Sequence, residues 1–459
     1  MANCREVSAE LQNDMLESPG PNLSWLGCAA IFATFSASSS TAFFPFIFGR
    51  LGFVVAPVLL GLYIALCCYL QQKVLDLALR FPEVRNTPAL AGLIAGHAAR
   101  NTCRFLQIGN QLIFLPCAWL IQVKALKQMV LPASTDHYVH PDQAPGILSC
   151  NIVWLFMFTL LALLATNLQR RFTHAVWLCK AGFLFNMLQG ILIITRVLLN
   201  PRDYAGQGLL KEALPALSLT TDTHERGYWA DVFTALSSFG YCYVPCFIAT
   251  EVMQELRVKS EVRKALWSST VCIFILYSVV GIFPVVAWGW DRQFDIFTEL
   301  QADLIGRSAN TMLLMASAMS FVITAISLNQ RLQEKVDPGF DPRDWSKKAC
   351  AMWFLYSLPS LTIGFLMLCF IPNLASLVGL MTAFVVPCSQ TIGPALLLLL
   401  AAHNGMLGHR LGCLEWVSVV AGFCTGALMI AVGGAATIHS IFFSGPLIHG
   451  NFFCDAVAG

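Results

Sequence analysis

Long apolar runs separated by short polar connections dominate the chain. A helix needs about 20 mostly apolar residues to cross about 30 Å of hydrocarbon, and eleven segments reach that length. They span approximately residues 25–48, 51–73, 105–130, 147–167, 174–198, 229–256, 266–290, 309–331, 349–371, 375–401 and 414–438. This pattern predicts an all-α polytopic membrane protein with about eleven transmembrane helices.

The composition fits a chain embedded in lipid. Of the 459 residues, 57% are hydrophobic and only 12% are charged, whereas a soluble globular protein carries about 25% charged residues. The formal net charge of +2 gives no electrostatic support for a nucleic-acid partner. Most of the 17 cysteines lie within apolar runs, where we expect them to pack as small hydrophobes. Membrane lipid is therefore the predicted surrounding, and neither a cofactor nor a metal is expected.

Basic residues indicate how the chain is oriented. With the N-terminus in the cytosol, 17 of the 28 Lys and Arg residues fall on the cytosolic side, nine fall outside and two lie within helices. That is the bias of membrane proteins, and eleven spans then put the C-terminus outside. The segment 1–21 lacks the basic and then apolar order of a signal peptide. The predicted organisation is a disordered cytosolic tail at 1–24, a first five-helix repeat at 25–199, an outer loop at 200–228, a second five-helix repeat at 229–402, and an eleventh helix with an outer tail at 403–459.

Two similar interruptions occur in the first and the sixth segments. Small polar residues at 36–41 precede Pro45, and residues 237–241 precede Pro245, so that Ser38 to Pro45 and Ser238 to Pro245 have the same spacing. Ser, Gly and Pro weaken a helix and free backbone groups, which are tolerated at membrane depth only against protein, water or a ligand. Freed N–H groups suit a carboxylate and freed carbonyls suit a cation. The pair of interruptions therefore indicates a binding site, and the alternative is close helix packing through small residues.

Three stretches carry a resemblance to a known family. They are the run from Ser39 through Pro45 to Gly52, the run from Ala235 through Pro245 to Leu256, and the run from Ile371 through Gly379 to Pro387. Together these runs resemble the amino acid/auxin permease family, within the larger group of amino acid–polyamine–organocation transporters. The resemblance covers nearly the whole chain and implies a five-plus-five inverted repeat with broken helices 1 and 6. It also implies symport of amino acids with protons or sodium by alternating access. One departure is that the family's glycines in the first interruption are replaced here by Ser, Ala and Thr.

The interruptions are also the predicted substrate site. The substrate's carboxylate and amino group are expected to meet the backbone and side chains of Ser38, Ser39, Ser40, Thr41, Phe239, Gly240 and Tyr241. The bulky rings of Phe239, Tyr241 and Tyr243 suggest an aromatic wall or gate beside the break.

Hydroxyl groups in the eighth segment bear on the coupling ion. Thr324 and Ser327 offer oxygens to a cation or a substrate, and the alternative is hydrogen bonding between helices. The first and eighth segments hold no clear cage of carboxylates and hydroxyls for sodium. The sequence therefore favours protons over sodium as the coupling ion.

Glu251 is the predicted gate residue at the cytosolic end of the sixth segment. It lies near the C-terminal end of that segment, where the helix dipole repels a carboxylate, so we expect it to pair with a cation. Lys180 and Arg331 are the candidates, and Arg257 is the local alternative. Protonating Glu251 would release such a pair. Two simpler interpretations remain: Glu251 as a solvated acid, and Lys180 as a lysine whose ammonium reaches the interface.

Two other functional classes compete with a carrier. One is a membrane receptor that keeps the transporter fold and senses amino acids. The other is an intramembrane enzyme, suggested only by the spacing of His137 and Asp142. The expected location is the plasma membrane or the vacuolar or lysosomal membrane.

Overall fold

The structure is a computed structural model of the whole chain, and it describes residues 23–81, 84–131, 151–168, 170–199, 228–289, 296–337, 344–370 and 374–443. Helices account for nearly all of this part, and the extended backbone in it is one isolated bridge between Leu23 and Leu256. The predicted all-α membrane architecture is confirmed. The predicted tail before residue 23, the outer loop, and the pair His137 and Asp142 lie outside the described residues.

Each of the eleven predicted segments corresponds to a helix or to a divided helix. In chain order these are α2 (Trp25–Ser40) with α3 (Phe44–Leu51), α4 (Val55–Arg80), α5 (Thr87–Val130), α6 (Asn151–Leu168), α7 (Phe172–Leu199), α9 (Tyr228–Ser238) with α10 (Ala249–Glu255), α11 (Val262–Trp288), α12 (Leu304–Val336), α13 (Lys347–Phe370), α14 (Leu374–Leu380) with α15 (Gly393–His403), and α16 (Cys413–Phe443). Eight helices in the described part are long and apolar enough to cross a membrane. The others are α6 and the divided first and sixth segments. The chain is an integral, multi-pass membrane protein.

The third segment begins earlier than the sequence indicated. A cytosolic loop was expected up to residue 104, but α5 begins at Thr87, with Asn86 as its N-cap and Pro88 in its first turn. Gly96 has φ +82° and ψ −174°, so the helix bends sharply there. A short helix from Thr87 therefore precedes the spanning part. The prediction missed it because residues 87–95 are too few to form a membrane span of their own.

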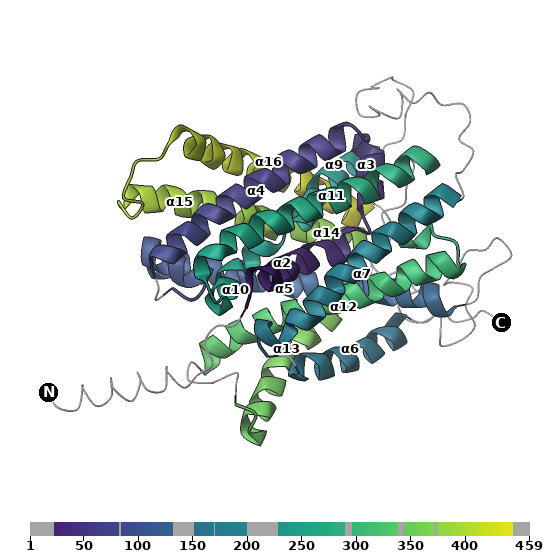
Figure 1. Cartoon of the computed structure of the whole chain (residues 1–459), viewed down its shortest axis with the longest axis horizontal. Coiled ribbons are helices and arrows are strands. Elements are labelled where there is room, and N and C mark those ends of the chain that lie inside the picture. The colour runs from purple at the N-terminus through teal and green to yellow at the C-terminus, as the bar shows by residue number, and fades with distance from the viewer. Residues whose placement is uncertain are drawn as a thin grey trace.

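The breaks of the first and sixth segments are buried within the bundle. In Figure 1, α2 and α14 run through the middle, with α4, α11 and α16 toward one side and α7, α12, α6 and α13 toward the other. α12 packs lengthwise against α7 and α5, and α2 packs against α7, α11 and α12. α7 and α2 approach closely at Gly182, where an added Cβ would lie 2.7 Å from Cγ2 of Thr34. This packing surrounds both interruptions with protein.

Candidate functional site

The first helix breaks where the sequence predicts. α2 ends at Ser40, a turn covers Thr41 to Phe43, and α3 begins at Phe44 with Pro45 in its first turn. Proline lacks the N–H that would bond four residues back, so it is tolerated at a helix start but would interrupt a continuous helix. The run of serines before it has low helix propensity. The break therefore follows from local sequence.

The break in the sixth helix is longer. α9 ends at Ser238, and two short 3₁₀ turns, Phe239–Cys242 and Pro245–Phe247, separate it from α10. Between the turns, Tyr243 is extended, with φ −125° and ψ 94°. Pro245 has no N–H to offer to the carbonyl of Tyr241. That carbonyl instead accepts a hydrogen bond from Ser40 Oγ at 3.1 Å, and the same hydroxyl also donates to the carbonyl of Ser36 in its own helix at 2.5 Å. Ser40 therefore joins the two breaks.

Side chains of neighbouring helices hold the two breaks together. Tyr277 of α11 donates its hydroxyl to the carbonyls of Ser36 (2.6 Å) and Cys242 (3.1 Å), one on each broken helix. Gln390 donates Nε2 to the carbonyl of Gly240 at 3.0 Å, and its own Oε1 accepts from the Tyr63 hydroxyl at 2.7 Å. Gln390 lies in a π-helical stretch that follows Pro387 in the tenth segment, and such stretches often occur at functional sites.

Aromatic rings fill the crossing of the breaks. Tyr241 stacks on Phe114 of α5, with ring centroids 5.3 Å apart and planes 10° apart. Phe43 meets Tyr241 edge to face at 5.6 Å, and Phe35 meets Phe114 at 5.4 Å. Tyr241 is thus at the centre, and Tyr243 is also buried. Phe239 faces a different place, the groove toward α4 and α16 described below.

Buried polar groups without partners lie next to the crossing. Asn110 lies one turn before Phe114 on α5, and neither atom of its amide is hydrogen-bonded within the described residues. The same holds for Ser38 Oγ and for the amide of Asn186 on α7. Because buried polar groups in proteins are almost always bonded, these atoms are candidate ligand contacts. Asn186 could not be recognised from the sequence, since a lone amide in an apolar run carries no signal.

Ser38 and Asn186 lie at the same level of two packed helices. Thr34 donates to the carbonyl of Cys179 at 2.6 Å, and seven residues further along α2, Thr41 accepts from Gln189 of α7 at 3.2 Å. Ser38 and Asn186 fall between these contacts. Their oxygens therefore lie in the region where α2 and α7 meet.

The other residues predicted to bind the substrate face different parts of the bundle. Ser40 and Thr41 bond across to Tyr241 and Gln189, as described above. Gly240 faces the tenth and eleventh segments, because an added Cβ would lie 2.9 Å from Val386 and 3.3 Å from Met429. The side chain of Ser39 is outside the described part.

The hydroxyls of α12 are engaged in packing. Thr324 Oγ1 donates to the carbonyl of Ser320 in its own helix at 2.9 Å. Ser327 Oγ accepts from Gln111 of α5 at 2.7 Å. Both groups follow the alternative of hydrogen bonding within and between helices.

Glu251 pairs with Arg331 of α12, one of the candidates from the sequence. The Nη2–Oε1 distance is 2.8 Å, and the two side chains are only 5% and 13% exposed for Arg331 and Glu251. The dipole argument, however, was wrong. The break makes α10 a separate helix that begins at Ala249, so Glu251 lies in its first turn, where the dipole favours an acid.

Lys180 does not reach Glu251. Lys180 is exposed on α7, and its ammonium lies 5.3 Å from the centroid of the Trp177 ring. This position matches the alternative of a lysine that extends toward the membrane surface. Its proposed part in the gate has no support in the contacts.

Several further contacts fix α10 at this end of the bundle. Leu23 donates to the carbonyl of Glu255 at 3.1 Å and accepts from the N–H of Arg257 at 3.0 Å. Glu255 Oε2 accepts from the N–H of Thr173 at the start of α7, at 2.7 Å. We call these contacts and the pair of Glu251 with Arg331 the inner contacts.

A cavity of about 280 Å³ lies beside the inner contacts. Its lining includes Gln71 of α4, Gln107 of α5 and Thr87, whose hydroxyl is 2.7 Å from that of Thr250. Gln71 Nε2 and Gln107 Oε1 are buried without hydrogen-bond partners within the described residues. This cavity therefore has polar groups available to a passing solute or water.

The opposite end of the broken helices also has contacts with neighbouring segments. Arg50 at the end of α3 pairs with Asp231 in the first turn of α9 at 2.9 Å. The N–H of Ile296 donates to the carbonyl of Ala42 in the first break at 3.1 Å. We call these the outer contacts. Both ends of the broken helices are thus joined to neighbouring segments.

Comparison with known proteins gives one family. The sequence model of the family described as "Transmembrane amino acid transporter protein" matches residues 22–439. A search of curated proteins gave no match.

Solved structures give the same fold at low sequence identity. Mhp1, a nucleobase-cation-symport-1 family transporter in a closed conformation with bromovinylhydantoin bound, is 14% identical, with a TM-score of 0.55 over 94% of this chain and 96% of that one. An Eremococcus coleocola manganese transporter in complex with an aromatic bis-isothiourea substituted compound is 13% identical, with a TM-score of 0.60 over 92% of this chain and 88% of that one. At such identities these likenesses establish the fold alone.

Proposed function

This chain belongs to the family of transmembrane amino acid transporters, and we propose that it carries amino acids across a membrane by alternating access, as a secondary active transporter. The observation that carries the proposal is the meeting of two broken helices inside the bundle, where Ser40 of one bonds the freed carbonyl of Tyr241 in the other. Broken helices of this kind form midplane substrate sites in many transporters.

In this proposal the substrate enters at the aromatic cluster. Its binding separates the rings of Phe43, Phe114 and Tyr241, which now fill the crossing. The freed backbone of residues 38–41 and 239–241 then meets the substrate's carboxylate and amino group. The unbonded amide of Asn110, one turn from Phe114, is a further contact.

Alternating access follows from the contacts at the two ends. A carrier must open one end while the other stays closed, so the outer contacts and the inner contacts must break in turn. The cavity beside Thr87 and Gln107 is then the route from the crossing to the inner side. The present arrangement, with both sets formed, corresponds to a closed intermediate.

Protons are the proposed coupling ion, through Glu251. Its carboxylate is nearly buried, and only Oε1 has a bonded partner, Arg331. Protonation removes the attraction between the two groups and frees α10 from α12.

A separate observation favours sodium as the second candidate for the coupling ion. Ser38 Oγ and Asn186 Oδ1 are neutral oxygens between α2 and α7 that have no hydrogen-bond partners within the described residues.

The test is uptake of a panel of radiolabelled amino acids into proteoliposomes, with proton or sodium gradients imposed separately. We expect uptake that persists when choline replaces sodium and rises as the external pH falls. Strict dependence on sodium would transfer the coupling role to the Ser38 and Asn186 region. Saturable binding of an amino acid without uptake would instead indicate a receptor that keeps the transporter fold.

A further inference from the structure

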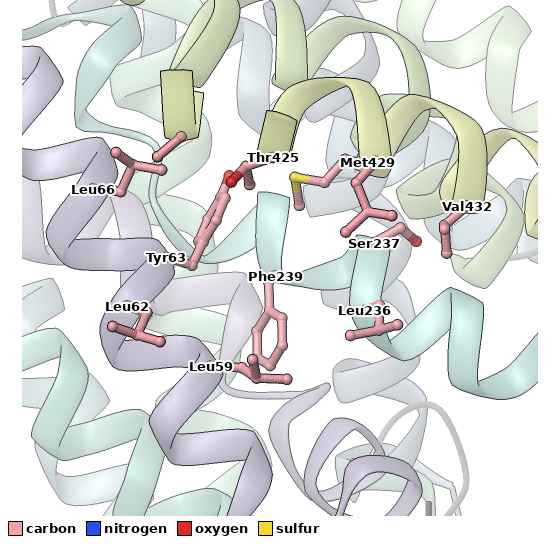
Figure 2. A pocket seen from close by; sticks show the side chains of 12 residues that line it. Leu59, Leu62, Tyr63, Leu66, Leu236, Ser237, Phe239, Thr425, Met429 and Val432 are labelled. Carbon is pink, nitrogen blue, oxygen red and sulfur yellow. The ribbon is translucent and has the colours of Figure 1, made fainter. Parts of the chain in front are cut away.

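A groove of about 440 Å³ opens between α4, α9 and α16, away from the crossing. Figure 2 shows its walls, with Leu59, Leu62 and Leu66 on α4, and Met429 and Val432 on α16. Its volume is within the range of about 300–1,000 Å³ that small-molecule sites occupy.

We propose that this groove binds one acyl chain of a membrane lipid, and that the bound chain holds the break of the sixth helix in its present position. The second half of the proposal rests on the proposed transport function, whereas the first half does not.

The occupant follows from where the groove opens. Leu62 on one wall is 66% exposed and Leu428 on the other is 60% exposed. Both helices are apolar enough to span a membrane, so the surface on which the groove opens is covered by lipid. The groove is continuous with that surface, and its nearest available ligand is an acyl chain.

The chemistry of the lining agrees with an acyl chain. None of its twelve residues is charged. Two of its hydroxyls are already bonded inside the protein, Tyr63 to Gln390 at 2.7 Å and Ser237 to the carbonyl of Thr234 at 3.0 Å. A headgroup would find little to bond, whereas a hydrocarbon chain replaces contacts that an open groove lacks.

Three lining residues connect the groove with the break. Phe239 begins the broken stretch, and Figure 2 shows its ring pointing into the groove toward Leu59. Met429 lies where a Cβ on Gly240 would meet it, at 3.3 Å. Tyr63 holds Gln390, which in turn bonds the carbonyl of Gly240 at 3.0 Å. An acyl chain in the groove therefore contacts side chains that hold residues 239 and 240 in place.

This arrangement predicts that lipid occupancy shifts the conformational equilibrium. If α9 moves during transport, Phe239 moves with it and the groove changes shape. A chain that fits the present shape then favours this closed state over the others.

Binding is tested by photolabelling, which needs no transport. The protein is placed in phosphatidylcholine vesicles in which a fraction of the lipid carries a photoactivatable acyl chain, and labelled peptides are mapped. We expect labelling concentrated on residues 59–66 and 421–432, above that of the lipid-facing residues Leu184 and Leu198 of α7. Even labelling of all exposed positions would mean surface lipid only and would overturn the site.

Matched variants sharpen this test. Ala421→Phe puts a ring into the groove, whereas Val420→Phe adds the same ring to a neighbouring exposed residue outside the lining. Since a filled groove cannot hold an acyl chain, we expect Ala421→Phe to reduce groove labelling to the level of Leu184 and Leu198 and Val420→Phe to leave it unchanged. Thr425→Phe, one turn further along α16, gives the same test should Ala421→Phe fail to insert. Undiminished labelling in these groove variants would refute the proposal.

The effect on transport is measured separately. The ring of Ala421→Phe replaces the lipid chain permanently, so we expect slower amino-acid uptake than in Val420→Phe. Lost labelling with equal uptake in both variants would keep the lipid site and overturn its link to the break. Absence of uptake in every form, including the unaltered protein, would count against the proposed function and leave the labelling result standing.

Discussion

Individual residues show how the two broken helices are held together, and they show which parts of the candidate site can be predicted from the sequence. Pro45, Pro245 and the serines before them could be recognised in advance, because proline removes a specific backbone donor. Asn186 and Gln390 could not, since their roles depend on which helices pack against them. Phe239 was assigned to the substrate site but faces the lipid-side groove, because sequence order does not say which way a residue in a 3₁₀ turn points.

Replacing Gly240 with a large side chain should abolish uptake without preventing insertion. A Cβ there already lies 2.9 Å from Val386, and a leucine would push the broken stretch away from the tenth segment. The matched control is Gly109→Leu on α5, where a Cβ meets no atom within 4 Å. Uptake by both variants is compared at equal amounts of inserted protein. Normal transport by Gly240→Leu would place the site elsewhere.

Neutralising Glu251 should slow transport and change its pH dependence. Glu251→Gln keeps the shape of the side chain but removes one negative charge beside the nearly buried Arg331, and breaking a buried pair typically costs about 3–5 kcal/mol. The measurement is uptake rate against pH, with surface expression as the control. The exchange of both residues, Glu251→Arg with Arg331→Glu, should recover part of the rate. An unaltered rate and pH profile in Glu251→Gln would reduce Glu251 to a structural residue.

Among the secondary-structure elements, the breaks in the first and sixth helices could be predicted from the sequence. The effects of those breaks on neighbouring residues could be predicted only in part. The spacing of Ser38 and Ser238 from the following prolines located both breaks. The helix dipole at Glu251 was assigned with the wrong sign, because the sequence does not reveal that α10 begins anew at Ala249. The short helix before Gly96 was missed, since residues 87–95 are apolar but too few to span a membrane.

The hydroxyl of Tyr277 should be a main clamp between the broken helices. Tyr277→Phe removes one hydrogen bond from each of two buried carbonyls, those of Ser36 and Cys242, and a hydrogen bond contributes about 0.5–1.5 kcal/mol to stability. The Ser36 carbonyl keeps the bond from Ser40 Oγ. We expect a lower melting temperature in detergent. Thr195→Ala is the control, because the hydroxyl of Thr195 bonds only within α7. Equal melting temperatures of Tyr277→Phe and the unaltered protein would contradict the clamp.

For the whole molecule, hydropathy was sufficient to predict the architecture. Eleven apolar segments gave the number and order of the helices, because each span must satisfy its own backbone in lipid. The closure of both ends could not be predicted, as it depends on contacts such as that of Arg50 with Asp231.

The orientation of the chain remains a prediction with a direct test. The excess of basic residues on one side places the N-terminus in the cytosol, and an odd number of spans places residues 451–459 outside. A tag at the C-terminus of intact cells should react with impermeant reagents. A tag that is protected while an N-terminal tag reacts would reverse the orientation, and protection of both would require an even number of spans.

The central claim is that the ends of the broken helices open in alternation, and distances between spin labels measure this directly. One pair, at Val54 and Leu304, reports the end with the outer contacts, and a second pair, at Val258 and Val336, reports the end with the inner contacts; all four residues are exposed. With a transported amino acid and an imposed proton gradient, we predict that each distance lengthens only while the other remains short. Lengthening of both together, or movement of neither, would contradict alternating access.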